Sequence, residues 1–387
     1  MFERRFFKNL DFLFVFILLL LLGASLLILS TASLNVIASQ PYFYVKNQAM
    51  WIGVGLVIAV GVASIDYQKF RKYSWWIYGL NLALLLAVFF IGSSAKGAQR
   101  WIPVTSGFKI QPSEFAKIFI ILTFADFLAR RQGKLNRFRD FIPPFLYVVV
   151  PMALIFKQPD LGTTLVFAAI FVGMMFVAGA NPWKFGGLLV GGILLVALIL
   201  WLHFSTDLPG FLKFAQGLPL PLQDYQLKRL TIFMDPMSDT SGDGYHIIQS
   251  IWAIGSGGLW GKGYRGGTQA QLNFLPEHHT DFIFSVVGEE FGFIGTITLL
   301  FLFAMFLLRA ISIATKSQDI YGMLVSSGVI SMFVFHILVN VGMTSGIMPV
   351  TGIPLPLISY GGSAMLTNMI SIGLLLSINI RRQRLMF

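Results

Sequence analysis

Cysteine is absent from the 387 residues, and charged side chains make up only 12% of them. Without cysteine there can be no disulfide, no thiolate metal site and no cysteine nucleophile. A soluble globular domain has about 25% charged residues, so this chain carries too little charge to cover a soluble surface of its size. Apolar residues reach 56%, and the mean hydropathy is +0.75. We therefore expect lipid to surround most of the chain.

Acidic residues are also scarce relative to basic ones, which leaves a formal net charge of +11. In a soluble protein this excess would suggest nucleic acid as a partner. Here most Lys and Arg residues lie in short segments between apolar runs, which membrane topology explains without nucleic acid. No Gly-rich loop ends in Gly-Lys-Ser or Gly-Lys-Thr, so an ATP-driven activity has no support in the sequence.

Apolar stretches long enough to cross a bilayer recur along the chain. The run from Leu13 to about Leu34 is longer than the apolar core of a signal peptide and is predicted to be the first span. The fold class is therefore all-α, a polytopic bundle treated as one domain over residues 1–387. The predicted helices are 13–34, 48–65, 75–93, 112–129, 141–157, 161–180, 184–203, 282–308, 320–343 and 362–380.

Basic residues concentrate in alternate loops, which predicts that both termini are cytoplasmic and that the number of spans is even. The opposite, extracytoplasmic side then holds four segments: 93–112, 157–160, 204–281 and 344–362. The segment 204–281, between the seventh and eighth helices, is the only long loop. Outward chemistry is expected on these segments.

Glu114 and Lys117 are charged residues inside a predicted membrane helix, where ionisable groups cost about 2.5–3.5 kcal/mol each on insertion scales. Their i, i+3 spacing places both on one helix face, where they can pair. Pro112 suits the first turn of that helix. A buried structural ion pair and a cavity for a charged head group are equally compatible with this pattern.

Asp281 lies where the long loop enters the eighth helix, in a stretch that also holds Glu277, His278 and His279. One interpretation is that Thr280 or Asp281 caps the helix. The other is a general base at the membrane surface, whose pKa partial desolvation would raise towards a useful value. A histidine-ligated metal is the weaker alternative, since adjacent histidines cannot easily face one ion.

Basic and aromatic residues mark the first outward segment, at Lys96, Arg100, Trp101 and Lys109. Arg can bind a phosphate through two parallel hydrogen bonds, and Trp can stack on a sugar; interfacial anchoring is the alternative. The stretch from Pro349 to Ser363 holds three prolines and three glycines. Non-helical backbone at membrane depth must be buried in protein or line a watery cavity; a simple outward turn is the alternative.

Other polar residues favour structural interpretations. Asp126 is predicted to pair with Arg130 at a helix end. His336 and Asn340 share a helix face and are expected to hydrogen-bond to neighbouring structure rather than to catalyse. The glycines of Gly255–Gly267 are expected to permit tight turns.

Five ordered stretches together resemble the SEDS family (shape, elongation, division and sporulation), and within it the elongation member RodA more than the division member FtsW. They cover nearly the whole chain and are Gly97–Ile102 (GAQRWI), Gln111–Ile118 (QPSEFAKI), Gln158–Gly162 (QPDLG), Phe274–Glu290 (FLPEHHTDFIFSVVGEE) and Gly346–Ser363 (GIMPVTGIPLPLISYGGS).

The resemblance implies a ten-helix peptidoglycan glycosyltransferase that uses lipid II in the bacterial plasma membrane. It also implies a class B penicillin-binding protein and other elongation-complex proteins as partners. The essential acidic residue of the family's HTDF motif corresponds to Asp281, its histidine to His279, and the family's Glu and Lys to Glu114 and Lys117.

The residues suggest a mechanism in which Asp281 accepts the proton of the acceptor hydroxyl. Arg100, Lys109 or Lys117 would hold the pyrophosphate, with Mg²⁺ or Mn²⁺ as a candidate cofactor. Gln111, Trp101, His279 and Glu114 complete the predicted substrate-binding set. Two alternatives remain open: a flippase for lipid II, which would need a polar path across the membrane, and a scaffold for cell-wall enzymes.

Overall fold

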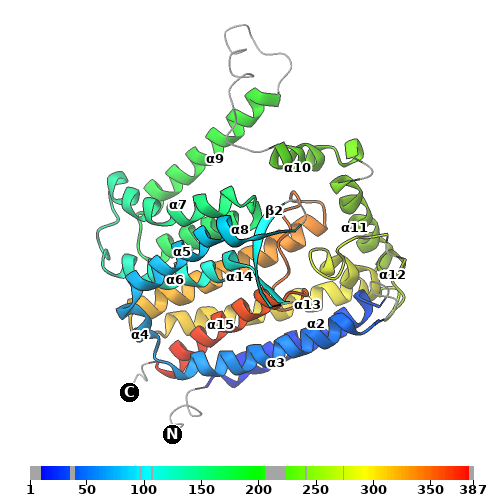
Figure 1. Cartoon of the computed structure of the whole chain (residues 1–387), viewed down its shortest axis with the longest axis horizontal. Coiled ribbons are helices and arrows are strands. Elements are labelled where there is room, and N and C mark those ends of the chain that lie inside the picture. The colour runs from blue at the N-terminus through cyan, green and yellow to red at the C-terminus, as the bar shows by residue number, and fades with distance from the viewer. Residues whose placement is uncertain are drawn as a thin grey trace.

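The computed structural model describes residues 10–34, 40–95, 98–105, 108–204, 224–239, 242–272 and 274–382, and most of this part is helical. Lys96 and residues 205–223 of the long loop lie outside the described residues. The described part contains ten long helices, most of which lie roughly along one direction (Figure 1). They are α2 (Phe12–Ala32), α3 (Phe43–Ser64), α5 (Ser74–Ile91), α6 (Pro112–Ala129), α7 (Ile142–Lys157), α8 (Leu161–Val177), α9 (Pro182–Phe204), α13 (Ile283–Thr315), α14 (Ile320–Thr344) and α15 (Gly362–Ile380).

Each of the ten predicted ranges overlaps one of these helices, with the largest differences at the start of α3 and at the end of α13, which continues to Thr315. By length and composition, eight helices of the described part can cross a membrane. The two others are α8, which has 17 residues, and α6, which carries Glu114, Lys117 and Asp126. The all-α polytopic fold is thus confirmed, while the count of ten spans stays a prediction.

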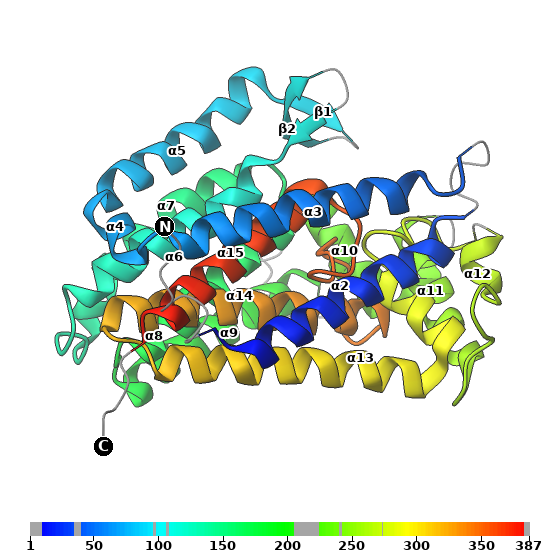
Figure 2. The same cartoon turned by 90° about the horizontal axis from the view of Figure 1, so that it is seen from below.

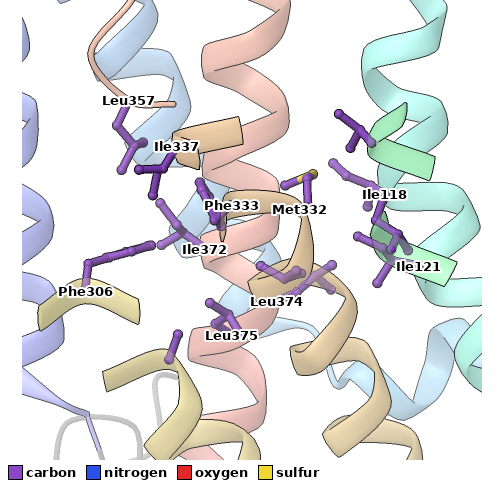
Figure 3. Packing of buried hydrophobic residues seen from close by; sticks show 14 of the residues in the cluster. Ile118, Ile121, Phe306, Met332, Phe333, Ile337, Leu357, Ile372, Leu374 and Leu375 are labelled. Atoms are coloured by element: carbon purple, nitrogen blue, oxygen red, sulfur yellow. The ribbon is translucent and has the colours of Figure 1, made fainter. Parts of the chain in front are cut away.

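The bundle core is apolar and continuous between helices distant in sequence. Phe306 of α13 stacks on Phe14 of α2 with ring centroids 5.0 Å apart, and meets Phe333 of α14 edge-on at 5.3 Å. Ile337 and Ile372 lie beside these rings (Figure 3). This close packing gives the outer ends of the helices fixed relative positions.

Small residues let α3 and α15 approach closely. A Cβ added at Gly373 of α15 would lie 2.7 Å from the carbonyl oxygen of Ala59 of α3. Figure 2 shows α3 lying over α15. Close contact through glycine is a common basis of helix association in membranes. By contrast, α9 extends away from the bundle (Figure 1), and Trp183 at its start is 88% exposed.

Short elements connect the helices. At the basic end, Asp126 pairs with Arg130 (2.8 Å), as predicted, and also with Arg71 of α4 (Tyr67–Lys72) at 3.0 Å. The 3-10 turn η1 (Phe138–Phe141) leads into α7. At the other end, the segment expected as a loop contains three short strands, β1 (Ser93–Ala95), β2 (Ala98–Thr105) and β3 (Phe108–Ile110), which form an antiparallel sheet in that order.

The long loop contains α10 (Asp224–Met234), η3 (Pro236–Asp239), α11 (Asp243–Gly257) and α12 (Thr268–Gln271). Its glycine-rich part packs backbone against backbone into a break in α13 at Gly292, whose φ is +63°. The N–H of Phe293 donates to Gly258 O at 2.9 Å, and the N–H of Gly263 donates to Glu290 O at 2.9 Å. The loop therefore satisfies backbone groups that the broken helix leaves free. The tight turns expected from Gly255–Gly267 are confirmed by positive φ at Gly258, Gly261 and Gly263.

Candidate functional site

A cavity of about 460 Å³ lies at the end of the bundle opposite the basic cluster. It is bounded by β2, by the first turns of α6, α8 and α15, by α10, by the turn before α13 and by residues 351–354 with part of α14. Its polar and charged lining residues are Arg100, Trp101, Gln111, Glu114, Lys117, Asp160, Thr163, Arg229, Glu277, Thr280, Asp281, His336, Thr351, Tyr360 and Ser363.

Asp281 is partly exposed at this cavity and does not occupy the N-cap position of α13. The residue at the N-cap position is Phe282, whose side chain makes no capping hydrogen bond. The capping interpretation of Thr280 or Asp281 is therefore wrong. The Thr280 hydroxyl instead donates to Glu277, with Oγ1 3.1 Å from Oε2.

The backbone on both sides of Asp281 is fixed by hydrogen bonds to distant segments. Asn340 Nδ2 donates to the carbonyl oxygen of Asp281 at 2.8 Å. The Ser359 hydroxyl donates to the carbonyl oxygen of Thr280 at 2.6 Å, and the N–H of Tyr360 donates to that of His279 at 3.1 Å. The 349–363 stretch is therefore buried protein that holds the Asp281 turn, rather than a simple outward turn.

Glu114 and Lys117 form the predicted pair, with Lys117 Nζ 2.8 Å from Glu114 Oε1. Their side chains are 9% and 2% exposed, yet both line the cavity. Lys117 Nζ also lies 3.4 Å from Nε2 of His336. The pair is thus a buried ion pair and also part of the cavity wall. The structure is therefore compatible with both predicted roles, the structural ion pair and the lining of a cavity for a charged group.

Asp160 is a lining residue that was not among the predicted site residues. It caps α8 by accepting from Thr163 N at 3.1 Å. Its Oδ2 also accepts from Gln111 Nε2 at 3.0 Å and from the Ser113 hydroxyl at 3.1 Å. An aspartate directly before an apolar helical run is an N-cap signal, so the QPDLG stretch could have revealed it. Asp160 joins the starts of α6 and α8.

The first outward segment contributes Arg100 and Trp101 but not Lys109. Arg100 donates from Nε to Gln158 O at 3.1 Å and from Nη2 to Pro159 O, which holds it against the turn before α8. Lys109, in β3, is exposed and does not line the cavity. A second cation, Arg229 of α10, lines it instead. Nothing in the sequence of the long loop distinguished Arg229 from its other basic residues.

His279 also lies outside the cavity lining and packs on Tyr44, with ring centroids 4.5 Å apart. His278 is buried, and its Nδ1 is 2.5 Å from Leu275 O. Burial lowers the pKa of His278 below its ordinary value, which the backbone hydrogen bond partly opposes. Among the residues that the structure describes, no three His, Asp or Glu side chains are grouped to hold a metal ion.

Comparison with known proteins agrees with this architecture. The family model of FtsW, RodA and SpoVE, described as "Cell cycle protein", matches residues 10–384. Peptidoglycan glycosyltransferase MrdB of Escherichia coli (strain K12) is 39% identical over 97% of this chain and 95% of its own length. Peptidoglycan glycosyltransferase RodA of Treponema pallidum (strain Nichols) is 36% identical over 97% and 98%.

Solved structures show the same fold. One, described as "Structural coordination of polymerization and crosslinking by a peptidoglycan synthase complex", matches with a TM-score of 0.76 and 30% identity, over 96% of this chain and 97% of the other. Rod shape determining protein RodA of Thermus thermophilus matches with a TM-score of 0.69 and 27% identity, over 97% and 98%. The chain therefore belongs to the FtsW, RodA and SpoVE family, the SEDS family that its motifs resemble.

Proposed function

We propose that this protein is a peptidoglycan glycosyltransferase that polymerises lipid II into glycan strands during cell elongation. One observation carries the proposal: a single cavity brings the carboxylate of Asp281 together with the cations Arg100, Lys117 and Arg229. The names of the curated relatives support polymerisation over the flippase alternative. A scaffold would not need charged residues buried around such a cavity.

Asp281 acts as the general base. The acceptor sugar hydroxyl loses its proton to the carboxylate while its oxygen attacks the anomeric carbon of the donor. The bond from that carbon to the polyprenyl pyrophosphate breaks, and the pyrophosphate leaves with the bonding electron pair. Direct displacement of this kind inverts the anomeric configuration. Since pyrophosphate leaves readily once its charge is met, one carboxylate suffices, in contrast to the two that simple glycosides require.

The cations of the cavity meet the charge on the pyrophosphate. Arg100 and Lys117 are assigned this role, and Arg229 takes the place predicted for Lys109. Trp101 offers a ring face to a sugar, and Gln111 offers an amide. Glu114 holds Lys117 through their ion pair, and His279 supports the Asp281 turn through its backbone rather than by contact with substrate.

A divalent cation is proposed only as an ion that arrives bound to the pyrophosphate of the substrate. The described residues offer no set of three ligands, but Mg²⁺ commonly uses one or two carboxylates together with substrate phosphates. Glu277 and Asp281 would be the carboxylates available to it, and the ion would supply charge neutralisation. Polymer formation that is unaffected by EDTA would exclude this ion.

The placement in the cell follows from charge. With the basic end of the bundle cytoplasmic, both termini lie inside and the cavity faces outward, where a plasma-membrane enzyme meets lipid II. Residues 1–387 act as one domain, with 204–281 as its large outer loop. The partner is a class B penicillin-binding protein that crosslinks the product, and the similarity of this chain to part of a peptidoglycan synthase complex supports that pairing.

Purified Asp281→Asn protein tests the base assignment. In a lipid II polymerisation assay with moenomycin present to block other polymerases, it should bind lipid II but make no polymer. Asp235→Asn is a matched control, because Asp235 is an exposed carboxylate of the same outer loop that caps a turn at Met237. Polymer made by Asp281→Asn at the wild-type rate would contradict the assignment.

A further inference from the structure

Two polar residues on α14, His336 and Asn340, lie one helical turn apart and are buried. Both contact the loop that follows α14. Asn340 Nδ2 donates to Ile353 O at 2.8 Å, and His336 Nδ1 lies 3.3 Å from Pro354 O. Asn340 also holds the backbone of Asp281. One face of α14 therefore contacts the Asp281 segment through Asn340 and the cation Lys117 through His336.

The neighbours of His336 allow a single protonation state. Pro354 O can only accept a hydrogen bond, so Nδ1 must carry the proton. The Lys117 ammonium can only donate, so Nε2, 3.4 Å from Nζ, must be the unprotonated nitrogen. A neutral imidazole with its proton on Nδ1 meets both demands at once, whereas an imidazolium would direct an N–H at the ammonium.

The ammonium of Lys117 is held in orientation by two acceptors. It has three N–H groups, of which one is directed at Glu114 Oε1 and one at Nε2 of His336. Fixing two of the three also fixes the direction of the last. Because Lys117 lines the cavity, that remaining N–H is available to a ligand there.

We propose that His336 is a positioning residue for Lys117: its Nε2 orients the ammonium so that one N–H is presented to the pyrophosphate of the substrate. This inference rests on the proposed function. His336 makes no contact with the reacting atoms and acts through Lys117. Binding of the whole lipid is spread over many contacts, so orientation of one cation is expected to affect turnover more than affinity.

Two substitutions of similar volume separate positioning from packing. His336→Leu fills the space but has no acceptor, and should lower kcat at least tenfold with KM within twofold of wild type. His336→Gln carries both an amide oxygen for Lys117 and an N–H for Pro354, and should keep kcat within threefold. Ser331→Ala is the control, since that hydroxyl bonds only its own helix, at Ser327 O.

Equal rates for the Leu and Gln variants, whether both high or both low, would overturn the proposal and leave the proposed function standing. Failure of the wild-type protein to polymerise lipid II would instead refute the proposed function.

A spectroscopic readout tests the geometry without turnover. The chain has five histidines, so the imidazole signals of ¹³C,¹⁵N-histidine-labelled protein can be assigned by comparison with the His336→Gln variant. The expected signature is an unprotonated Nε2 and a protonated Nδ1, with the Nε2 signal shifted in the double variant Glu114→Gln, Lys117→Met, which removes both charges of the buried pair. A proton on Nε2, or an Nε2 signal that is the same in this double variant as in the wild type, would refute the proposal.

Discussion

Glu114 and Lys117 allow one prediction to be worked through, because the pair is both structural and placed at the cavity. The perturbation is a cycle of three variants: Glu114→Gln, Lys117→Met, and the double variant. Each single substitution keeps roughly the original volume and leaves one charge without its ion partner. The double substitution removes both charges together.

The burial of the two side chains sets the expected magnitudes. Glu114 is 9% and Lys117 2% exposed, so water screens a charge left alone only weakly. Removing one partner of a buried pair costs about 3–5 kcal/mol, whereas replacing both with neutral groups is about neutral. The single variants should therefore be strongly destabilised, and the double variant should recover most of that loss.

Activity should not recover with stability. If Lys117 meets the charge of the leaving pyrophosphate, its loss should lower kcat by about 10²–10³, as for other preorganised groups that stabilise developing charge. Thermal unfolding in detergent can be followed by the fluorescence of the eight tryptophans. Lipid II polymerisation with moenomycin present gives the rate.

The double variant decides the question. Stable protein without polymer would support the role in catalysis. A double variant that polymerises within threefold of the wild-type rate would refute it and leave the pair as a purely structural feature. Single variants as stable as the double variant would refute the argument from burial.

Two further predictions concern the segment that carries Asp281. Gly292→Ala should reduce the yield of folded protein sharply, because φ at this position is +63° and the new Cβ would lie 2.3 Å from Gly261 N. The yield is measured by size-exclusion chromatography, and a folded peak as large as that of the wild type would contradict this prediction. Burial lowers the pKa of His278, so its stability contribution is complete above the unfolded value of about 6.5 and falls as the pH drops below it. His278→Asn, which can still donate to Leu275 O, should lose less Tm than wild type between about pH 7.5 and 5.5; equal losses would exclude His278 as the source.

The helices could be predicted from the sequence because the bilayer leaves few alternatives. A chain that crosses hydrocarbon must satisfy its backbone internally, so an apolar run of suitable length becomes a helix. This held even for α6, which carries three charged residues. The sheet formed by β1, β2 and β3 was not predicted, since no comparable constraint acts on short polar segments outside the membrane.

The members of the site were only partly predictable. Asp281, Glu114 and Lys117 are ionisable groups in or beside apolar helices, a position that marks them in the sequence. Arg229 carries no such mark, because it is one basic residue among several in a loop. Its place at the cavity depends on how α10 folds back over the bundle, which is a tertiary property.

The contacts that fix Asp281 were invisible in the sequence for a different reason. Asn340, Ser359 and Tyr360 all act on backbone atoms of residues 279–281, and a backbone carbonyl or N–H has no signature in a sequence. The i, i+4 spacing of His336 and Asn340 indicated a shared face but not what that face would meet. Because the turn is held by its backbone, replacing the Asp281 side chain with the isosteric amide leaves these three hydrogen bonds in place. Loss of polymerisation in Asp281→Asn can then be assigned to the carboxylate itself rather than to displacement of the turn.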